Sequence, residues 1–210
     1  MKSPEHPIFL ESVEYIRSQI GFTGLTSIQQ SVLERIIHSS GDLNIQSYLK
    51  FSSDACAVAI DALKKGANIL TDTFMAKAAV SPVAKRTLNS NVKCILEMAP
   101  EIIDSSSTTR SAIGMKQMWL DMEKKEEFLV GPVVVIGSAP SALMTLLDLI
   151  HEGRKRPSLI IGMPVGFIGV PESKTRLLNS DCSNIVIQGS KGGASLAAAT
   201  VNALLKAADY

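Results

Sequence analysis

His38 is the side chain in this sequence best suited to moving a proton near neutral pH. It is one of three histidines among 210 residues, and it lies near the end of a helix expected to begin at Thr26 or Ser27 and to stop near Ser40-Gly41. The negative end of the helix dipole favours a protonated ring there. Arg35 shares its helix face, so the pair suits a polyanionic substrate. The alternative interpretation is a histidine that only caps helix carbonyls.

Two further segments combine a cation with free backbone amides. Arg110 and Ser111 open a helix after a run of hydroxyl residues, which is good carboxylate-binding chemistry, although hydroxyls also serve as ordinary helix caps. Lys191, Gly192 and Gly193 join a strand to a helix. Their amides and the lysine suit a carboxylate, or the glycines only make a sharp turn.

The turn at Gly137 and Ser138 follows an apolar strand and opens a helix, the place where a dinucleotide fingerprint would lie. Pro140 lacks an N–H in the first helical turn, and no acidic residue follows the next strand to bind a ribose hydroxyl. A tight turn whose amides face another anion is therefore preferred over nucleotide binding.

The pattern of short apolar segments predicts the scaffold that positions these groups. Helical stripes alternate with strands that are apolar on both faces, which is typical of a parallel sheet covered by helices. We expect an α/β three-layer sandwich with a mainly parallel sheet of about five strands, in one domain spanning residues 1–210. Asp72 and residues 137–138, 163–164 and 189–190 should meet at the carboxyl ends of the strands. The strands are expected at residues 68–72, 92–98, 133–136, 159–161 and 185–188.

Composition argues against several classes of protein. Lys and Arg number 21 against 20 Asp and Glu, so there is no basic excess for a nucleic acid. Three widely spaced cysteines predict a reducing compartment, the cytoplasm, and give no metal-ligand spacing. The charged N-terminal segment and the lack of a long apolar run predict neither export nor a membrane span.

The residues taken together resemble the precorrin-8X methylmutases of cobalamin biosynthesis over nearly the whole chain. The likeness rests on short blocks that occur in the same order. They are Arg-Ile-Ile-His-Ser-Ser-Gly-Asp (35–42), Phe-Ser (51–52), Thr71-Asp72 with Met75, Thr-Arg-Ser-Ala (109–112), the segment 135–143, Pro-Val-Gly-Phe (164–167), Glu-Ser-Lys (172–174), Lys-Gly-Gly (191–193) and Val-Asn-Ala-Leu (201–204).

The resemblance implies an isomerase that moves a methyl group from carbon eleven to carbon twelve of ring C, giving hydrogenobyrinate or cobyrinate. No cofactor and no metal ion are implied. In this resemblance His38 is the acid/base residue, and Ser12 and Arg35 are substrate contacts. Members of the family are homodimers with a large pocket near the subunit boundary. Whether the substrate already carries cobalt stays open.

A corrinoid of this stage carries several carboxylates around a flat apolar ring, which calls for separated anion holders above an apolar floor. The expected floor is Met75, Met163, Val165 and Phe167. Two other functions remain as alternatives, a non-catalytic corrinoid-binding protein and a nucleotide-binding α/β module. The full set of expected substrate contacts is Ser12, Arg35, Thr71, Asp72, Met75, Arg110, Ser111, Gly137, Ser138, Lys191, Gly192 and Gly193.

Overall fold

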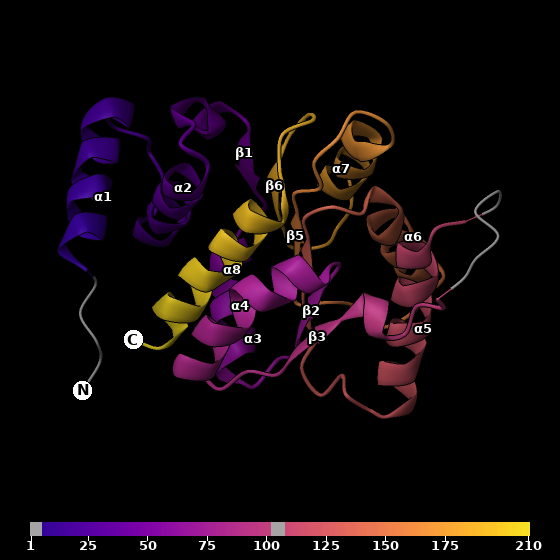
Figure 1. Ribbon diagram of the computed structural model, residues 1–210. Coiled ribbons are helices and arrows are strands. Elements are labelled where there is room, and N and C mark those ends of the chain that lie inside the picture. The colour runs from indigo at the N-terminus through magenta and orange to yellow at the C-terminus, as the bar shows by residue number, and fades with distance from the viewer. Residues whose placement is uncertain (1–5, 102–107) are drawn as a thin grey trace.

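A mixed β-sheet forms the middle layer of the protein (Figure 1). The computed structural model describes residues 6–101 and 108–210, and its six strands lie in the order β1-β6-β5-β4-β2-β3. Only β1 runs antiparallel to its neighbour within this sheet. The strands are β1 (Leu49–Phe51), β2 (Ile69–Thr71), β3 (Val92–Cys94), β4 (Val133–Ile136), β5 (Leu159–Gly162) and β6 (Asn184–Ile187).

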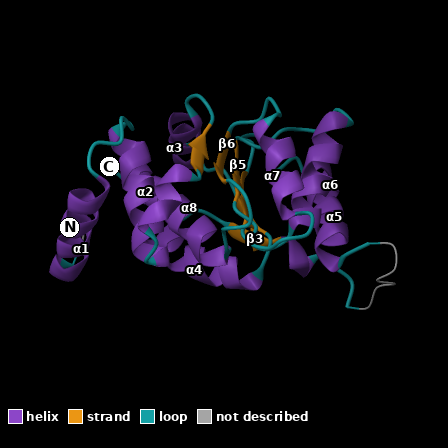
Figure 2. Cartoon of the chain, turned by 90° about the horizontal axis from the view of Figure 1, so that it is seen from above, coloured by secondary structure: helices purple, strands orange, loops and turns teal. Residues whose placement is uncertain are grey.

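Helices cover both faces of this sheet, as Figure 2 shows from above. One apolar cluster joins the first face to α1 (Pro7–Ile20), α2 (Ser27–Ser40), α3 (Ala55–Lys64), α4 (Phe74–Arg86) and α8 (Ala194–Ala208). A second cluster joins the other face to α5 (Arg110–Lys124), α6 (Pro140–His151) and α7 (Val170–Leu178). Two short 3₁₀ helices, η1 (Leu43–Ser47) and η2 (Ile95–Glu97), complete the described elements.

Strand β4 shows why the sheet is buried on both sides. Val133 and Val135 belong to the first apolar cluster, whereas Val134 and Ile136 belong to the second. Successive side chains of a strand point to opposite faces, so a strand with helices on both sides must be apolar throughout. The predicted three-layer α/β sandwich with a mainly parallel sheet is confirmed.

The structure adds one strand and two helices to the prediction. All five predicted strands are present, but the segment 92–98 forms only the three residues of β3 before it turns into η2. The antiparallel edge strand β1 and the helices α4 and α7 were not predicted. In α4 the buried residues are only Ala76, Val80 and Ala84, while Phe74 and Met75 are exposed, so its sequence lacks a strong apolar stripe.

Local capping fixes the ends of the helix that carries His38. Thr26 and Gln29 form a reciprocal capping box, with Gln29 Oε1 accepting from the Thr26 amide at 3.0 Å. Gly41 closes the helix in a left-handed conformation with φ of 67°. Both ends of α2 therefore lie where the sequence predicts them, and His38 falls in its last turn.

Two further observations bear on the class of protein. No helix among residues 6–101 and 108–210 combines the length and the apolar character that crossing a membrane requires. The three cysteines are buried and unpaired, and burial raises the pKa of Cys56 to about 11. These thiols are packing residues rather than nucleophiles.

Candidate functional site

His38 is held by the first helix of the chain. The Nδ1 atom of His38 and the hydroxyl of Ser12 lie 2.8 Å apart, and the Phe9 ring meets the imidazole edge to face with centroids 5.1 Å apart. The residue is exposed, so its ring is not sealed in the core, and its Nδ1 atom is engaged by the Ser12 hydroxyl rather than by a helix carbonyl. Within the described ranges 6–101 and 108–210 no hydrogen bond reaches Nε2, which leaves that nitrogen open to a substrate.

A groove with cations at its side is lined by Phe9 and Arg35, which connect it to His38, although His38 itself does not line it. The Arg35 guanidinium stacks over the Phe9 ring, 4.4 Å from its centroid, and the Lys206 ammonium lies 5.8 Å from the same centroid. This α1–α2–α8 groove has a volume of about 440 Å³. Its lining consists of Phe9, Leu10, Val13, Glu14, Arg17, Ile28, Ser31, Glu34, Arg35, Ala203, Lys206, Ala207 and Tyr210.

A second group of predicted residues meets at the carboxyl edge of the sheet. The backbone amide of Gly193 donates to the carbonyl of Met163 at 2.8 Å, and an added Cβ at Gly192 would lie 2.1 Å from that same oxygen. Gly137 packs against Ala194, where an added Cβ would lie 2.5 Å from Cα. The turns after β4, β5 and β6 are therefore in contact, and only glycine fits at positions 137 and 192.

The Asp72 carboxylate binds the backbone amides of the turn between β4 and α6. Its Oδ2 accepts hydrogen bonds from the amides of Gly137, Ser138 and Ala139 at 3.1, 2.6 and 2.8 Å. Burial raises the pKa of Asp72 above the ordinary value, and the three amide hydrogen bonds oppose that rise. The helix N-terminus predicted to bind a substrate carboxylate thus already binds a carboxylate of the chain itself.

Lys191 connects this edge to the helix of His38. Its ammonium forms an ion pair with Asp42, four residues beyond His38, and lies 5.2 Å from the Tyr48 ring centroid. The hydrogen bond from Lys191 lowers the pKa of Asp42 below its usual value. A substrate carboxylate at Lys191 would have to compete with Asp42.

Lys174 lies beneath the same loop and holds it from inside. The residue is 1% exposed, and its ammonium donates to the carbonyls of Gly189 and Lys191, the first at 2.8 Å and the second at 2.5 Å. Burial lowers the pKa of Lys174 from 10.5 to about 8. The loop that presents Lys191 is therefore fastened to α7 through one buried cation.

Lys174 is expected to make stability depend on pH in the alkaline range. The unfolded chain binds more protons between pH 8 and 10.5, so this residue's contribution to the free energy of unfolding rises with pH across that window. Urea unfolding measures this at several pH values. The free energy of unfolding of the wild type, minus that of Lys174→Met, should increase by roughly 2–3 kcal/mol as the pH rises through this window. Lys64→Met, at an exposed position, is the control, and a pH-independent difference for Lys174→Met would contradict the expectation.

The segment around Arg110 is only partly engaged by the chain. Arg110 is exposed, and its Nε donates to the carbonyl of Pro100 at 2.9 Å. Thr109 caps α5 and its hydroxyl lies 2.7 Å from that of Ser141, whereas Ser111 is half-buried. The neighbouring hydroxyl run at 105–107 lies outside the described residues.

Some of the remaining residues predicted to contact the substrate are exposed, and others are buried. Met75, Val165 and Phe167 are 70%, 51% and 84% exposed, which suits an apolar floor, but Met163 is fully buried. Thr71 is also fully buried, and its hydroxyl lies 3.2 Å from the carbonyls of Thr73 and Lys93. Thr71, Asp72 and Met163 therefore support the edge from within and offer no surface to a ligand in this chain.

The structure thus brings the predicted residues together in two groups. Ser12 and Arg35 surround His38 on the α1–α2 pair, while the glycine turns and Lys191 form the carboxyl edge of the sheet. Asp42 links the two groups through its ion pair with Lys191. Among residues 6–101 and 108–210 no three His, Cys, Asp or Glu side chains are placed to hold a metal ion.

A larger hollow of about 620 Å³ lies elsewhere, near the ends of α6 and α7. Its two arginines are already paired, Arg156 with Asp181 at 2.8 Å and Arg176 with Asp148 at 2.7 Å. It contains none of the predicted site residues, and its size alone does not make it a site.

Comparison with known proteins identifies the family to which this chain belongs. The model of the precorrin-8X methylmutase family matches residues 7–207, nearly the whole chain. The chain belongs to this family. Membership makes it a methylmutase of cobalamin biosynthesis, which is an isomerase, and does not favour the non-catalytic or nucleotide-binding alternatives.

Individual methylmutases are similar along their full lengths. The chain is 35% identical to the cobalt-precorrin-8 methylmutase of Synechocystis sp., covering 96% of this chain and 95% of the relative. It is 36% identical to the precorrin-8X methylmutase of Pseudomonas aeruginosa, covering 94% and 93%. A solved precorrin-8X methylmutase of Thermus thermophilus superposes with a TM-score of 0.83 at 31% identity, covering 96% and 95%.

Sequence reasoning missed several residues that shape this methylmutase site. Phe9 packs on both His38 and Arg35, Asp42 binds Lys191, and Glu34 is a buried carboxylate beside Arg35. For Glu34 the available signal was its place in α2, next to Leu33 and between the apolar pairs Val32-Leu33 and Ile36-Ile37, because an unpaired carboxylate is rarely buried.

Proposed function

We propose that the protein moves a methyl group from carbon eleven to carbon twelve of ring C in precorrin-8X or cobalt-precorrin-8, with His38 as the acid and base. One observation carries this proposal. Ser12 engages Nδ1 of His38 at 2.8 Å, and the other ring nitrogen stays open beside a groove flanked by Arg35 and Lys206. A proton donor next to cations is the arrangement that a polyanionic macrocycle requires.

The two nitrogens of the His38 ring allow a reversible proton transfer to the substrate. In the imidazolium form Nδ1–H donates to Ser12 Oγ, and Nε2–H is the proton available to ring C. After transfer the neutral ring keeps its Nδ1–H, and Nε2 is ready to take the proton back. Protonation makes the conjugated system electron-poor and eases a sigmatropic methyl shift, after which the proton returns, so the reaction has no net proton or electron demand.

Ser12 can hold the His38 ring and contact the substrate at the same time. A hydroxyl has one donor and two acceptor positions, so Ser12 accepts from His38 and still has its own hydrogen for the substrate. Arg35, which packs on Phe9 rather than in the core, is placed for a carboxylate. Arg110 and Lys191 are proposed to hold further carboxylates, and Lys191 exchanges Asp42 for the substrate when it does so.

The proposal includes a homodimer. Ligand pockets for drug-sized molecules measure about 300–1,000 Å³, and a corrinoid with several carboxylate arms is larger than such ligands. The α1–α2–α8 groove has only about 440 Å³ and is open to solvent. Exposed apolar side chains at the carboxyl edge, Met75, Phe167 and Ile168 among them, supply surface for a second subunit to enclose the ring.

The same proposal places the protein in the cytoplasm, without a nucleic-acid partner. The three buried and unpaired cysteines suit a reducing compartment. The net charge of +1 supplies no counterion-release term for binding to a phosphate backbone.

The decisive experiment is to incubate the purified protein separately with precorrin-8X and cobalt-precorrin-8 and to record visible spectra. Methyl migration changes the conjugated path, so conversion of one substrate or both gives a time-dependent spectral change. A thermal-shift panel supplies the second arm. Stabilisation by corrinoids without turnover would support the non-catalytic alternative, and stabilisation by NAD or ATP alone would support the nucleotide-binding one.

A further inference from the structure

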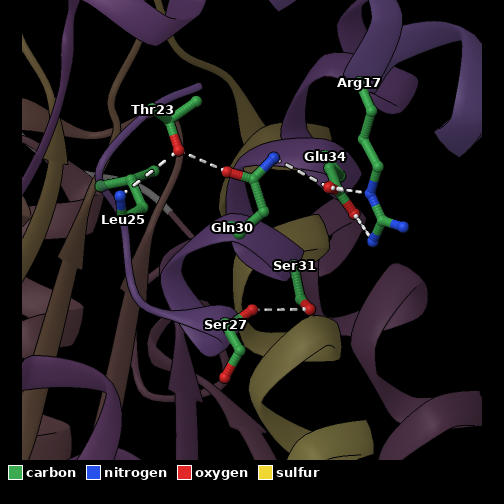
Figure 3. Close-up of polar contacts among 7 residues, drawn as sticks. All are labelled: Arg17, Thr23, Leu25, Ser27, Gln30, Ser31 and Glu34. Atoms are coloured by element: carbon green, nitrogen blue, oxygen red, sulfur yellow. Dashed lines mark hydrogen bonds and ion pairs between the residues drawn. The ribbon is translucent and has the colours of Figure 1, made fainter. Parts of the chain in front are cut away.

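A buried carboxylate joins the first helix of the protein to the helix of His38 (Figure 3). Glu34 is 3% exposed. Its Oε1 accepts from Arg17 Nε at 2.7 Å, and its Oε2 accepts from Arg17 Nη2 at 3.1 Å. This is the bidentate geometry that makes an arginine–carboxylate pair strong and directional.

The network continues into the segment between the two helices. Gln30 Nε2 donates to Glu34 Oε1 at 2.8 Å, and the hydroxyl of Thr23 donates to Gln30 Oε1 at 2.6 Å. The amide of Leu25 then donates to the Thr23 hydroxyl at 3.3 Å. Glu34, through Arg17 and Gln30, therefore ties α2 both to α1 and to the linker that connects them.

Helix α1 has few other attachments. It lies at the outer edge of the molecule in both views, next to α2 (Figures 1 and 2), and its main contacts run to α2 and η1. Only Val13 and Ile16 of α1 are buried, while Ile8 and Tyr15 are 67% and 63% exposed. Ile20 is half-buried and packs against the same core, and the Phe9 ring contacts His38 and Arg35. Apolar contacts are not directional, so the bidentate ion pair contributes to the register of α1 along α2.

The register of α1 matters because this helix supplies the groups around the proposed acid. Ser12, one and a half turns before Arg17, contacts His38 Nδ1, and Phe9 contacts both the His38 ring and Arg35. A shift of α1 by about 1 Å would break a 2.8 Å hydrogen bond, and a misplacement of this size in a catalytic group costs up to about a hundredfold in rate.

We propose that Glu34 and Arg17 are positioning residues for His38, and that they act by fixing α1 so that Ser12 holds the imidazole. Neither residue has a contact with His38. Both line the α1–α2–α8 groove, but their charges are already paired with each other, so by this proposal they act on the position of α1 rather than on the substrate. The catalytic consequence rests on the proposed function, whereas the structural consequence, the Ser12–His38 contact, does not.

The test uses Glu34→Gln and Arg17→Met in the full-length protein, with kcat and KM measured for methyl migration. Both variants are expected to lower kcat about tenfold or more, with a smaller change in KM, because the acid is misplaced while Arg35 and Lys206, the cations beside the Phe9 ring, remain. In parallel, ¹⁵N NMR of histidine-labelled protein should show the His38 Nδ1 signal shifted toward its position in Ser12→Ala. His38→Ala identifies that signal among the three histidines.

The control is Asp148→Asn, which breaks another arginine–carboxylate pair between two helices, with Arg176 at the same 2.7 Å distance. It should leave both kcat and the His38 signal at wild-type values. A double-mutant cycle supplies the sharper criterion. If Glu34 acts through Ser12, then Glu34→Gln lowers kcat less than about twofold in the Ser12→Ala background.

Two results would overturn the inference. Glu34→Gln and Arg17→Met that lower the melting temperature but leave the His38 signal unchanged would reduce the pair to a stability element. Fully additive effects of Glu34→Gln and Ser12→Ala would exclude action through the Ser12 contact. If the wild type converts neither substrate, the proposed function fails, but the NMR comparison still decides the positioning role.

Discussion

His38→Ala is expected to lower the rate of methyl migration by about 10²–10⁴-fold, the range that a positioned general acid and base contributes. Among the described residues next to the His38 ring none can replace it, because Ser12 and Phe9 contact the ring and the guanidinium of Arg35, which packs on Phe9, stays protonated. Corrinoid binding should change little, since the carboxylates are held by cations. Stopped-flow spectra with substrate give the rate, and titration with the isomer that carries the methyl group on carbon twelve gives the affinity.

His151→Ala is the matched control for this result. His151 is exposed at the end of α6, in the hollow away from the predicted site residues, so its loss should leave the rate unchanged. If His38→Ala turns over at close to the wild-type rate, the proton must come from another group and the assignment of His38 is wrong. A parallel loss of rate and affinity would instead make His38 a binding residue.

Asp72→Ala is expected to lower the free energy of unfolding by about 3–5 kcal/mol. The substitution removes the acceptor for three amides in the turn before α6, and two of those amides belong to the buried residues Gly137 and Ala139. A buried N–H without an acceptor bears its full desolvation cost. Urea unfolding at neutral pH measures the change directly.

Asp72→Asn separates the hydrogen bonds from the charge. The asparagine oxygen can still accept from the three amides, and burial, which raises the pKa of Asp72 against the effect of those amides, disfavours the charge that this variant removes. The loss for Asp72→Asn should therefore be less than half the loss for Asp72→Ala. Equal losses for the two variants would mean that the negative charge, rather than the hydrogen-bond acceptor, stabilises this turn.

The elements that sequence analysis located are those with local signals. Thr26 and Gly41 mark the ends of α2 by capping chemistry that involves only neighbouring residues. The parallel strands β2, β4, β5 and β6 are largely apolar runs, although Lys93 interrupts the edge strand β3. Strand β1 was missed because three residues, Leu49 to Phe51, form a strand only by pairing with β6. Helix α7 was missed because it has only nine residues, and Val170 and Leu177 are its only buried apolar side chains, so it shows no apolar stripe.

In the candidate site, too, sequence predicts what depends on local residues and misses what depends on distant ones. The position of His38 at a helix end follows from local sequence, but the partners of the predicted anion holders come from distant segments. Lys191 pairs with Asp42, and the amides after Gly137 are bonded to Asp72. Sequence identifies which groups can bind an anion. It does not reveal that the chain supplies the anion itself, because that depends on how turns pack at the sheet edge.

The two outermost strands of the sheet also restrict how this protein meets other copies of itself. Each offers only three residues, Leu49–Phe51 on one side and Val92–Cys94 on the other, and each has a lysine at its centre, Lys50 and Lys93. Strands this short, with a charge in the middle, are poor templates for backbone pairing between molecules. Any assembly should therefore form through side chains of helices and turns, and the protein should resist fibrous, strand-by-strand aggregation at high concentration.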